Sequence, residues 1–518
     1  MGSCGALAFE RSHLLALTTW LLVMLIAVQQ LYPIFFNYSA EWKCNNNGTN
    51  ESSQFTRDCV VYEHCPNGSL VFKPDPPFYS AADEWSMRCG QSAWYMSLVS
   101  TMQFVGVSIG TIVWSHLGDR FGRRPTGIAA VVVGMLAVAG TGLTTCWQTL
   151  IIARLFVGFS IGGSLTVTYA HVIELIRPQH RMALRGFVNW GAARVLMTLW
   201  CFLWPNWRTA SFVMAGVHNV PLLLLLIFVL PESPVWLKSM DRKDQLRKAL
   251  DRINWLNGTK RLADVDMHTQ TQKAQQDALL KRQPEQQHHR TYSIKDILFT
   301  TPWIRRRTLV FMLMWFTASL GSFANDLYSG RLAGGFYTNQ FLFAATTYVS
   351  KIVLFFVDYY LPWFKRRTLH QGGLGITIIG FSAVIILSHR FTHILMFHTP
   401  QTHHIATYVN IGSSLFNLYT WDACYLTAAE GYPTVVRSIG VGACSFMARM
   451  GAIIAPQVAY ISVIWPPGMF CVIVVWCSFC FVISVLFLPE TKNIELPMTL
   501  EQTDTEPSSP DDRTKCQE

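Results

Sequence analysis

Residues 466–488 read PPGMFCVIVVWCSFCFVISVLFL, a run of 23 positions without a charged side chain. Pro489 and Glu490 close this run on its C-terminal side. A helix needs roughly 20 mostly apolar residues to cross the hydrocarbon core of a bilayer. The run therefore predicts a membrane-spanning helix, and the same criterion applies to the rest of the chain.

Eleven further stretches meet that criterion, which gives twelve predicted spans. They lie at about 14–36, 93–114, 127–146, 149–172, 186–204, 210–230, 308–325, 340–361, 372–388, 405–429, 438–463 and 466–488. Of the 518 residues, 51% are hydrophobic and 14% are charged, whereas a soluble protein carries about 25% charged residues. The composition therefore excludes a soluble globular protein, and its apolar content excludes a disordered chain.

The basic residues orient these spans. The net charge of +10 does not indicate nucleic-acid binding, because the basic residues fall in short clusters between apolar runs. Clusters follow the second, fourth, eighth and tenth spans: Arg120, Arg123 and Arg124; Arg177, Arg181 and Arg185; Lys365, Arg366 and Arg367; and Arg437. With twelve spans, all these loops lie on the side of both termini. The positive-inside rule makes that side cytoplasmic, and we expect a multi-pass plasma-membrane protein.

The loop at 38–92 must then lie outside the cell, and its composition agrees with that position. It contains Cys44, Cys59, Cys65 and Cys89, which an oxidising exterior allows to form disulfides. Four cysteines allow three pairings, which the sequence leaves open. Glycosylation sequons lie at Asn47, Asn50 and Asn67, with Asn37 at the edge of the loop. A fifth sequon, Asn257, falls on the cytoplasmic side, and we expect it to stay unmodified.

The two halves of the chain repeat each other. Glu174, Arg181 and Gly186 follow the fourth span with spacings of seven and five. Glu430, Arg437 and Gly442 follow the tenth span with the same spacings, at an offset of 256. Residues 230–233 (LPES) close the sixth span and 488–491 (LPET) close the twelfth, at an offset of 258. Two motifs in one register predict a duplicated six-helix unit.

These motifs carry a resemblance to a known family. Residues 117–124 (LGDRFGRR) resemble the signature between the second and third helices of the major facilitator superfamily. Residues 232–234 (ESP), together with Tyr432, Pro433, Thr434 and Arg437, are similar to the organic ion transporters of solute carrier family 22. The resemblance implies an all-α membrane protein with twelve transmembrane helices in two pseudo-symmetric six-helix bundles. In the second half, Pro362 stands at the aspartate position of the loop signature.

The predicted domains follow from this topology. They are a cytoplasmic N-terminus with the first helix (1–37), an extracellular glycosylated and disulfide-bearing loop (38–92), helices 2–6 (93–237), a cytoplasmic loop (238–300), helices 7–12 (301–490) and a disordered cytoplasmic tail (491–518).

Paired acids and arginines at the predicted cytoplasmic helix ends suggest a gate. Asp119 faces Arg120, Arg123 and Arg124, and we expect it to form a latch that breaks and reforms during transport. We expect Glu174 with Arg181 and Glu430 with Arg437 to act in the same way. The alternative is that these arginines only fix orientation, but that role needs no paired acids.

Charges inside spans indicate a substrate pathway, because each costs about 2.5–3.5 kcal/mol at the bilayer centre. Three cations stand out: Lys351 in the eighth span, Arg449 in the eleventh and Arg194 in the fifth. Asp326, Asp358 and Asp422 lie in or near spans, but none is equally central. An anionic substrate is therefore expected to supply the counter-charge. Arg194 has a structural alternative, which is snorkelling or pairing with Asp326 or Asp422.

The family resemblance points the same way for two of these residues. Lys351 and Arg449 match positions at which the organic anion branch carries basic residues. Aromatic side chains in the same set of spans suit flat organic substrates, although helix packing explains each one alone. The candidate substrate-binding residues are Lys351, Arg449, Tyr348, Trp315, Phe316, Tyr425 and Trp190.

The sequence thus predicts a polyspecific organic anion transporter that works by alternating access, with exchange against a dicarboxylate implied by the resemblance. One alternative is a transporter of cations or of carnitine-like zwitterions in which the basic residues pair internally. Another is a non-transporting receptor or scaffold on a carrier fold. No catalytic constellation, cofactor motif or metal-ligand spacing is visible, so we expect no enzyme activity, cofactor or metal. The expected partners are small organic anions and the lipid bilayer.

Overall fold

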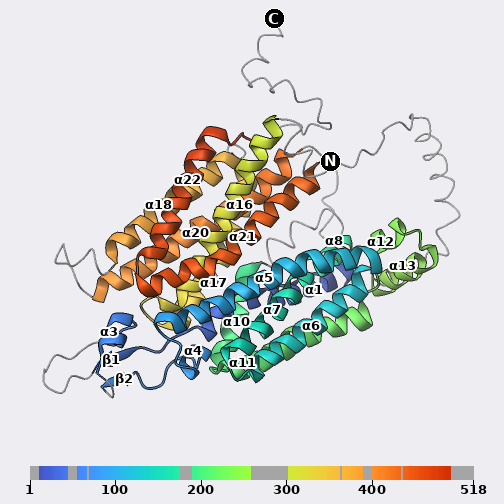
Figure 1. Cartoon of the computed structure of the whole chain (residues 1–518). Helices are drawn as coiled ribbons and strands as arrows, with labels where there is room; N and C mark the ends of the chain where they lie inside the picture. The colour runs from blue at the N-terminus through green and yellow to red at the C-terminus, as the bar shows by residue number, and fades with distance from the viewer. Residues whose placement is uncertain are drawn as a thin grey trace, which may run out of the picture. The chain divides into compact units, whose positions relative to one another are not determined.

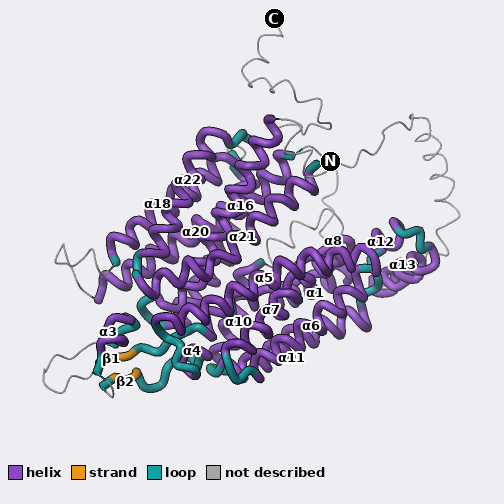
Figure 2. Tube along the Cα trace, in the orientation of Figure 1, coloured by secondary structure: helices purple, strands orange, loops and turns teal. Residues whose placement is uncertain are grey.

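A computed structural model describes residues 11–44, 55–66, 69–175, 189–257, 302–361, 365–388, 400–432 and 436–491. These residues are almost entirely helical, with two short strands (Figure 2). Their contacts divide the chain into two compact units. The first contains residues 1–40, 73–87 and 98–290, and the second contains residues 41–72, 88–97 and 291–518.

The first unit is a bundle of long apolar helices. Its elements are α1 (Arg11–Ala27), η1 (Val28–Leu31), α2 (Pro33–Phe36), α4 (Ala81–Glu84), α5 (Gly90–Phe121, from residue 98), α6 (Arg123–Leu143), α7 (Trp147–Gly163), η2 (Ser164–Thr168), α8 (Tyr169–Leu175), α10 (Trp190–Leu203), α11 (Trp207–Leu224), η4 (Leu225–Val229), α12 (Pro234–Ser239) and α13 (Lys243–Asn257). Figure 1 shows α4 at one end of this bundle and α12 and α13 at the other.

The second unit holds the other bundle and a small disulfide-bonded module. Its elements are β1 (Trp42–Cys44), α3 (Cys59–His64), β2 (Leu70–Phe72), α16 (Pro302–Tyr328), η6 (Ser329–Arg331), α17 (Phe336–Tyr360), α18 (Arg366–Leu387), α20 (Pro400–Gly431), α21 (Arg437–Ile464) and α22 (Gly468–Phe487). The core of this unit lies where α16, α18, α20, α21 and α22 pack together (Figure 1).

Each of the twelve predicted spans coincides with a helical segment. Within the described ranges, nine helical segments are long and apolar enough to cross a membrane by length and composition. The other three predicted spans are α10, α17 and α20. Helix α20 carries Asn410, Asn417 and Asp422, which bond to Asn325, Ser322 and Lys351 in the same unit. Polar side chains with partners inside the bundle explain how such a helix fits a membrane protein.

Helices α5 and α7 approach each other closely through facing small residues. Gly106 and Gly110 on α5 and Gly158 and Gly162 on α7 each have the GxxxG spacing. A Cβ atom at Gly158 would overlap the carbonyl oxygen of Gln103. Such contacts allow membrane helices to pack backbone against backbone.

The first span is broken, and a buried arginine satisfies the break. Pro33 has no N–H, so the carbonyl of Gln29 loses its normal helical donor. Arg154 Nη2 and Gln103 Nε2 both donate to that carbonyl at 2.8 Å. Arg154 also donates to Gln103 Oε1 through Nε at 3.0 Å and Nη2 at 2.8 Å, and its side chain is fully buried.

The small module contains the predicted cysteines. Strands β1 and β2 pair antiparallel with Lys43 opposite Val71. Of the three possible pairings, the structure has the disulfides Cys44–Cys65 and Cys59–Cys89. Asn47, Asn50 and Asn67 lie outside the described residues, whereas Asn37 donates its side-chain amide to Ser100 Oγ at 3.2 Å.

Candidate functional site

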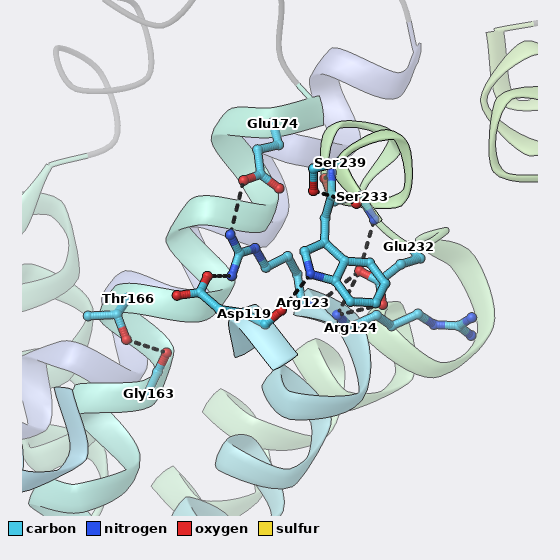
Figure 3. A network of polar contacts seen from close by, with 10 residues as sticks. Asp119, Arg123, Arg124, Gly163, Thr166, Glu174, Glu232, Ser233 and Ser239 are labelled. Carbon is cyan, nitrogen blue, oxygen red and sulfur yellow. Dashed lines mark hydrogen bonds and ion pairs between the residues drawn. The ribbon is translucent and has the colours of Figure 1, made fainter. Parts of the chain in front are cut away.

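The predicted latch residue Asp119 lies at the junction between α5 and α6. Its Oδ1 forms an ion pair of 2.5 Å with Arg123 Nη1, and Arg123 Nη2 lies 3.7 Å from Glu174 Oε1 on α8 (Figure 3). One arginine therefore bridges acids from two helices. Arg120 is exposed, and its guanidinium lies over the ring of Phe121.

Glu232, which follows the sixth span, caps the first turn of α6. Its Oε1 accepts from the backbone N–H groups of Arg123 at 3.0 Å and Arg124 at 3.1 Å (Figure 3). The free N–H groups and dipole of a helix start favour a carboxylate at this place. Gly122 has a φ of +111°, and a Cβ there would lie 2.7 Å from Glu232 Oε2. The glycine of the loop signature is thus required by both its backbone conformation and the nearby carboxylate.

The second unit repeats this construction at the start of α18. Glu490 accepts from the backbone N–H groups of Arg366 at 3.0 Å and Arg367 at 3.2 Å. Arg366 forms an ion pair with Glu430 on α20, at 3.1 Å from Nη2 to Oε1. Thr491 Oγ1 donates to Glu430 Oε2 at 3.0 Å. We call the two arrangements the corner networks, one around Arg123 and Glu232 and one around Arg366 and Glu490.

The correspondence between the corner networks extends to the second arginine of each pair. Arg124 Nη2 donates to the carbonyl of Ile227 at the end of the sixth span. Arg367 Nη2 donates to the carbonyl of Val485 at the end of the twelfth. Ile227 and Val485 are related by the same offset of 258 that relates the two Leu-Pro-Glu motifs. The sequence repeat is therefore also a repeat of contacts.

The expected partners within these networks need correction. Glu430 pairs with Arg366, not with Arg437, whose Nε donates to the carbonyl of Tyr432 at 3.4 Å. Glu174 pairs with Arg123, and Arg181 lies outside the described residues. A spacing of seven along one loop suggested a local pair. The acids instead reach arginines that begin another helix, which is brought near only by the packing of the bundle.

The surroundings of Lys351 contradict the expectation that no acidic residue neutralises its charge. Its Nζ lies 2.6 Å from both carboxylate oxygens of Asp422, with α17 supplying the lysine and α20 the acid. Both side chains are about one-fifth exposed, at 20% and 23%. The premise that an anionic substrate must neutralise both Lys351 and Arg449 is therefore wrong for Lys351.

Arg449 lies on α21, which packs against α20. Tyr425 of α20 lies near enough to the guanidinium to influence its charge. Within the described ranges, no carboxylate lies within 4.0 Å of Arg449. Tyr425 packs against Trp315 at 4.5 Å between ring centroids and against Trp421 at 6.0 Å. We call Trp315, Trp421 and Tyr425 the aromatic cluster.

The structure brings together only some of the predicted substrate residues. Phe316 packs against Trp476 at 5.3 Å, and Tyr348 lies one turn before Lys351 on α17. Trp190 begins α10 in the first unit. Arg194 is buried on the same helix, 2% exposed. Its expected alternative partner Asp422 is bound to Lys351 instead.

Three features of the structure are not predictable from the sequence patterns above. Asp422 was noted only as an acid near a span, because nothing in the sequence indicates that α17 and α20 place it beside Lys351. Glu232 and Glu490 were recognised as motif residues, but their capping role depends on contacts more than 100 residues apart. Arg154 lies inside the fourth predicted span, and Gln29 and Gln103 at similar depth in other spans were the signal available for it.

Comparison with known sequences gives a consistent set of relatives. The sequence profile described as "Sugar (and other) transporter" matches residues 21–501. An uncharacterized protein of Caenorhabditis elegans is 34% identical, over 95% of this chain and 94% of the relative. Solute carrier family 22 member 7 of Mus musculus is 28% identical, over 82% and 74%. Solute carrier family 22 member 16 of Bos taurus is 28% identical, over 82% and 70%.

Comparison with solved structures finds the same fold. The inward-open xylose transporter XylE from E. coli matches 93% of this chain and 96% of its own, with a TM-score of 0.57. At 15% sequence identity, this likeness concerns the architecture of twelve helices in two bundles.

Proposed function

The chain belongs to the family of sugar and other transporters of the major facilitator superfamily, with relatives in solute carrier family 22, and from that premise we propose that it transports organic anions by alternating access. Its relatives are transporters and not enzymes. The substrate is a small molecule, which binds within the membrane and crosses by alternating access.

Arg449 is the single observation that carries the anion assignment. A cation inside a membrane bundle is costly unless it has a partner or a function, and no carboxylate among the described residues neutralises this one. A carboxylate or sulfonate pairs with the guanidinium in this proposal, while the aromatic cluster, which contains Tyr425, packs against a flat organic body.

The corner networks supply the gating part of the proposal. Each combines an ion pair with a capped helix start, and such bonds can break and reform when helices shift. The second half keeps this device although Pro362 replaces the signature aspartate. The retained ion pair and helix cap of the second network support a working carrier over a retired carrier fold that serves as a receptor.

The orientation proposed for the chain has both termini in the cytoplasm and the plasma membrane as its location. The basic loops support this orientation. The two disulfides in the loop at 38–92 support an oxidising exterior for the opposite side. Asn47, Asn50 and Asn67 are the proposed glycan acceptors in that loop. At Asn37 the side-chain amide is already hydrogen-bonded to Ser100, and a glycan there requires that bond to break.

A second candidate substrate class is a carnitine-like zwitterion. The ion pair between Lys351 and Asp422 favours it, because one of the two basic residues is indeed paired internally. A substrate ammonium could compete for Asp422 while its carboxylate binds Arg449.

Uptake into proteoliposomes distinguishes these candidates. Purified protein is tested with a labelled aromatic sulfonate, tetraethylammonium and carnitine, each with and without the same compound preloaded inside. The proposal predicts saturable sulfonate uptake that preloaded sulfonate accelerates, together with loss of this uptake in Arg449→Gln. Saturable uptake of carnitine without sulfonate uptake would support the second candidate, and uptake of tetraethylammonium alone would contradict both.

A further inference from the structure

The pairing of Lys351 with Asp422 lowers the net positive charge that the substrate encounters at the proposed site. The lysine Nζ lies 2.6 Å from each of the two carboxylate oxygens, so the acid holds it with both oxygens at once. A charge-assisted contact of this geometry is strong, especially where water is scarce. With each side chain about one-fifth exposed, the pair is within reach of a ligand but is already neutral as a unit.

Helix α20 places this pair beside the aromatic cluster. Trp421 immediately precedes Asp422, and Tyr425 lies three residues after it, so all three lie on one side of the helix. The Trp421 and Tyr425 rings stack with an interplanar angle of 24°, and Trp315 of α16 meets both rings edge-on. The ion pair therefore belongs to the same local surface as the rings.

Arg449 approaches this region from α21, which packs against α20. Tyr425 is the link, because it packs in the aromatic cluster on α20 and lies near enough to Arg449 to influence its charge. Three charged residues are joined to the cluster in the described ranges: Lys351, Asp422 and Arg449. Their sum is one positive charge rather than the two that Lys351 and Arg449 would give alone.

We propose that Asp422 is a specificity-determining residue, which neutralises Lys351 so that the site favours organic anions with a single negative charge and an aromatic body. This inference rests on the proposed function of anion transport. A monoanion pairs with Arg449 and leaves the Lys351–Asp422 pair intact. A dianion brings a second charge that must be desolvated without a free cation to receive it, and it is repelled by Asp422. An exchange partner is then a second monoanion, not the dicarboxylate that the family resemblance implies.

Wild type and three charge variants test this count. Wild type carries one net positive charge at the site, Asp422→Asn carries two, Lys351→Gln carries none and the double variant Lys351→Gln/Asp422→Asn carries one. Asp241→Asn is the matched control, because Asp241 forms an ion pair with Lys243 in which both side chains are more than four-fifths exposed. The probes are benzenesulfonate and 1,3-benzenedisulfonate, whose charges do not change with pH and which do not cross lipid unaided.

The readout is the ratio of disulfonate to monosulfonate uptake in proteoliposomes, at equal amounts of inserted protein. We expect wild type to prefer the monosulfonate and Asp422→Asn to raise the ratio at least about ten-fold, as one added charge at short range can do. Lys351→Gln should lower monosulfonate uptake by about ten-fold. The double variant should return to within about two-fold of the wild-type ratio, and the control should not change it.

The outcomes separate this inference from the proposed function. If wild type takes up neither sulfonate, anion transport itself is wrong. If it takes up sulfonates but prefers the disulfonate, or if Asp422→Asn leaves the ratio unchanged, the role of Asp422 is wrong while anion transport stands. If Asp422→Asn does not fold, the single Lys351→Gln and the double variant still decide, because a double variant unlike wild type contradicts the charge count.

Discussion

Arg154 shows how a single residue can hold a charge inside the bundle without offering it to a substrate. Its guanidinium is enclosed by the carbonyl of Gln29, the amide of Gln103 and the rings of Tyr32 and Phe36. All of these partners are neutral, and together they satisfy a break in the first span. This differs from Arg449, which no carboxylate among the described residues approaches within 4.0 Å.

Replacing Arg154 should therefore damage stability first. Arg154→Met leaves the Gln29 carbonyl and the Gln103 side-chain oxygen without their arginine donor, which should cost about 2–4 kcal/mol of folding free energy. The measurement is the Tm of purified protein in detergent, with Arg247→Met in the exposed part of α13 as the control. A variant as stable as wild type would show that the hydrogen bonds from Arg154 to Gln29 and Gln103 contribute nothing to the stability of the fold.

Glu84 at the end of α4 leads to a prediction of how the stability of the protein depends on pH. The hydrogen bond from Arg208 lowers the pKa of Glu84, assisted by the hydrogen bond from Trp207 and the Arg208 charge. Because the folded-state pKa is below the unfolded value, the resulting stability is present above the unfolded pKa, which is 4.5, and is lost as the pH falls through the folded pKa. Wild type should exceed Glu84→Gln in Tm at pH 7, with the difference shrinking below pH 4.5. A difference that stays constant across this range would contradict the assignment.

For single residues, the sequence indicates which charged side chains form ion pairs better than it indicates their partners. The loop signature singles out Asp119, and the repeated spacing singles out Glu174 and Glu430, because both patterns can be read along the chain. Their partners depend on which helices pack together, and that information is not local. For the same reason Lys351 was expected to be unbalanced, since Asp422 is 71 residues away in the chain.

At the scale of elements, the corner networks explain why α6 and α18 can both begin with two arginines. Positive side chains at a helix N-terminus oppose the helix dipole. Glu232 and Glu490 offset this by accepting from the first N–H groups of the two helices. The motif that closes the last helix of each half is therefore a cap for the third helix of that half.

This role predicts matched effects in the two halves. Glu232→Ala and Glu490→Ala should each destabilise the protein by about 1–2 kcal/mol, the usual cost of losing a helix cap. The glutamine variants should recover part of this stability, because the amide oxygen can still accept one hydrogen bond. Thermal unfolding of the four variants measures both effects. A clear loss in one half and none in the other would contradict the repeat of contacts.

The elements themselves were largely predictable from hydropathy. In the described part of the chain, all twelve predicted spans contain a helix, because the length of an apolar run depends on the run itself. Hydropathy does not explain how the polar side chains of α20 are accommodated. Its asparagines and Asp422 have partners on α16 and α17, and only the packed bundle shows that they are satisfied.

At the scale of the whole molecule, the duplicated halves carry similar versions of the proposed gate, whereas the proposed substrate site differs between them. Both corner networks share a carboxylate that caps a helix start and an arginine paired with a glutamate, but the aromatic cluster, the Lys351–Asp422 pair and Arg449 all belong to the second unit. A gate must open on both halves in turn, whereas a substrate needs specific chemistry at one place. This division fits a carrier that evolved from a duplicated six-helix unit.

The charge of Arg449 is the most direct test of this account. Proteoliposomes containing wild type or Arg449→Asp are compared for uptake of benzenesulfonate and of an aromatic cation of similar size, such as trimethylphenylammonium. The account predicts that wild type takes up the sulfonate and not the cation. It also predicts that reversing the charge at Arg449 lowers sulfonate uptake by at least about 100-fold. Undiminished sulfonate uptake by Arg449→Asp, or wild-type uptake of the cation alone, would contradict the proposal that this cation selects an anionic substrate.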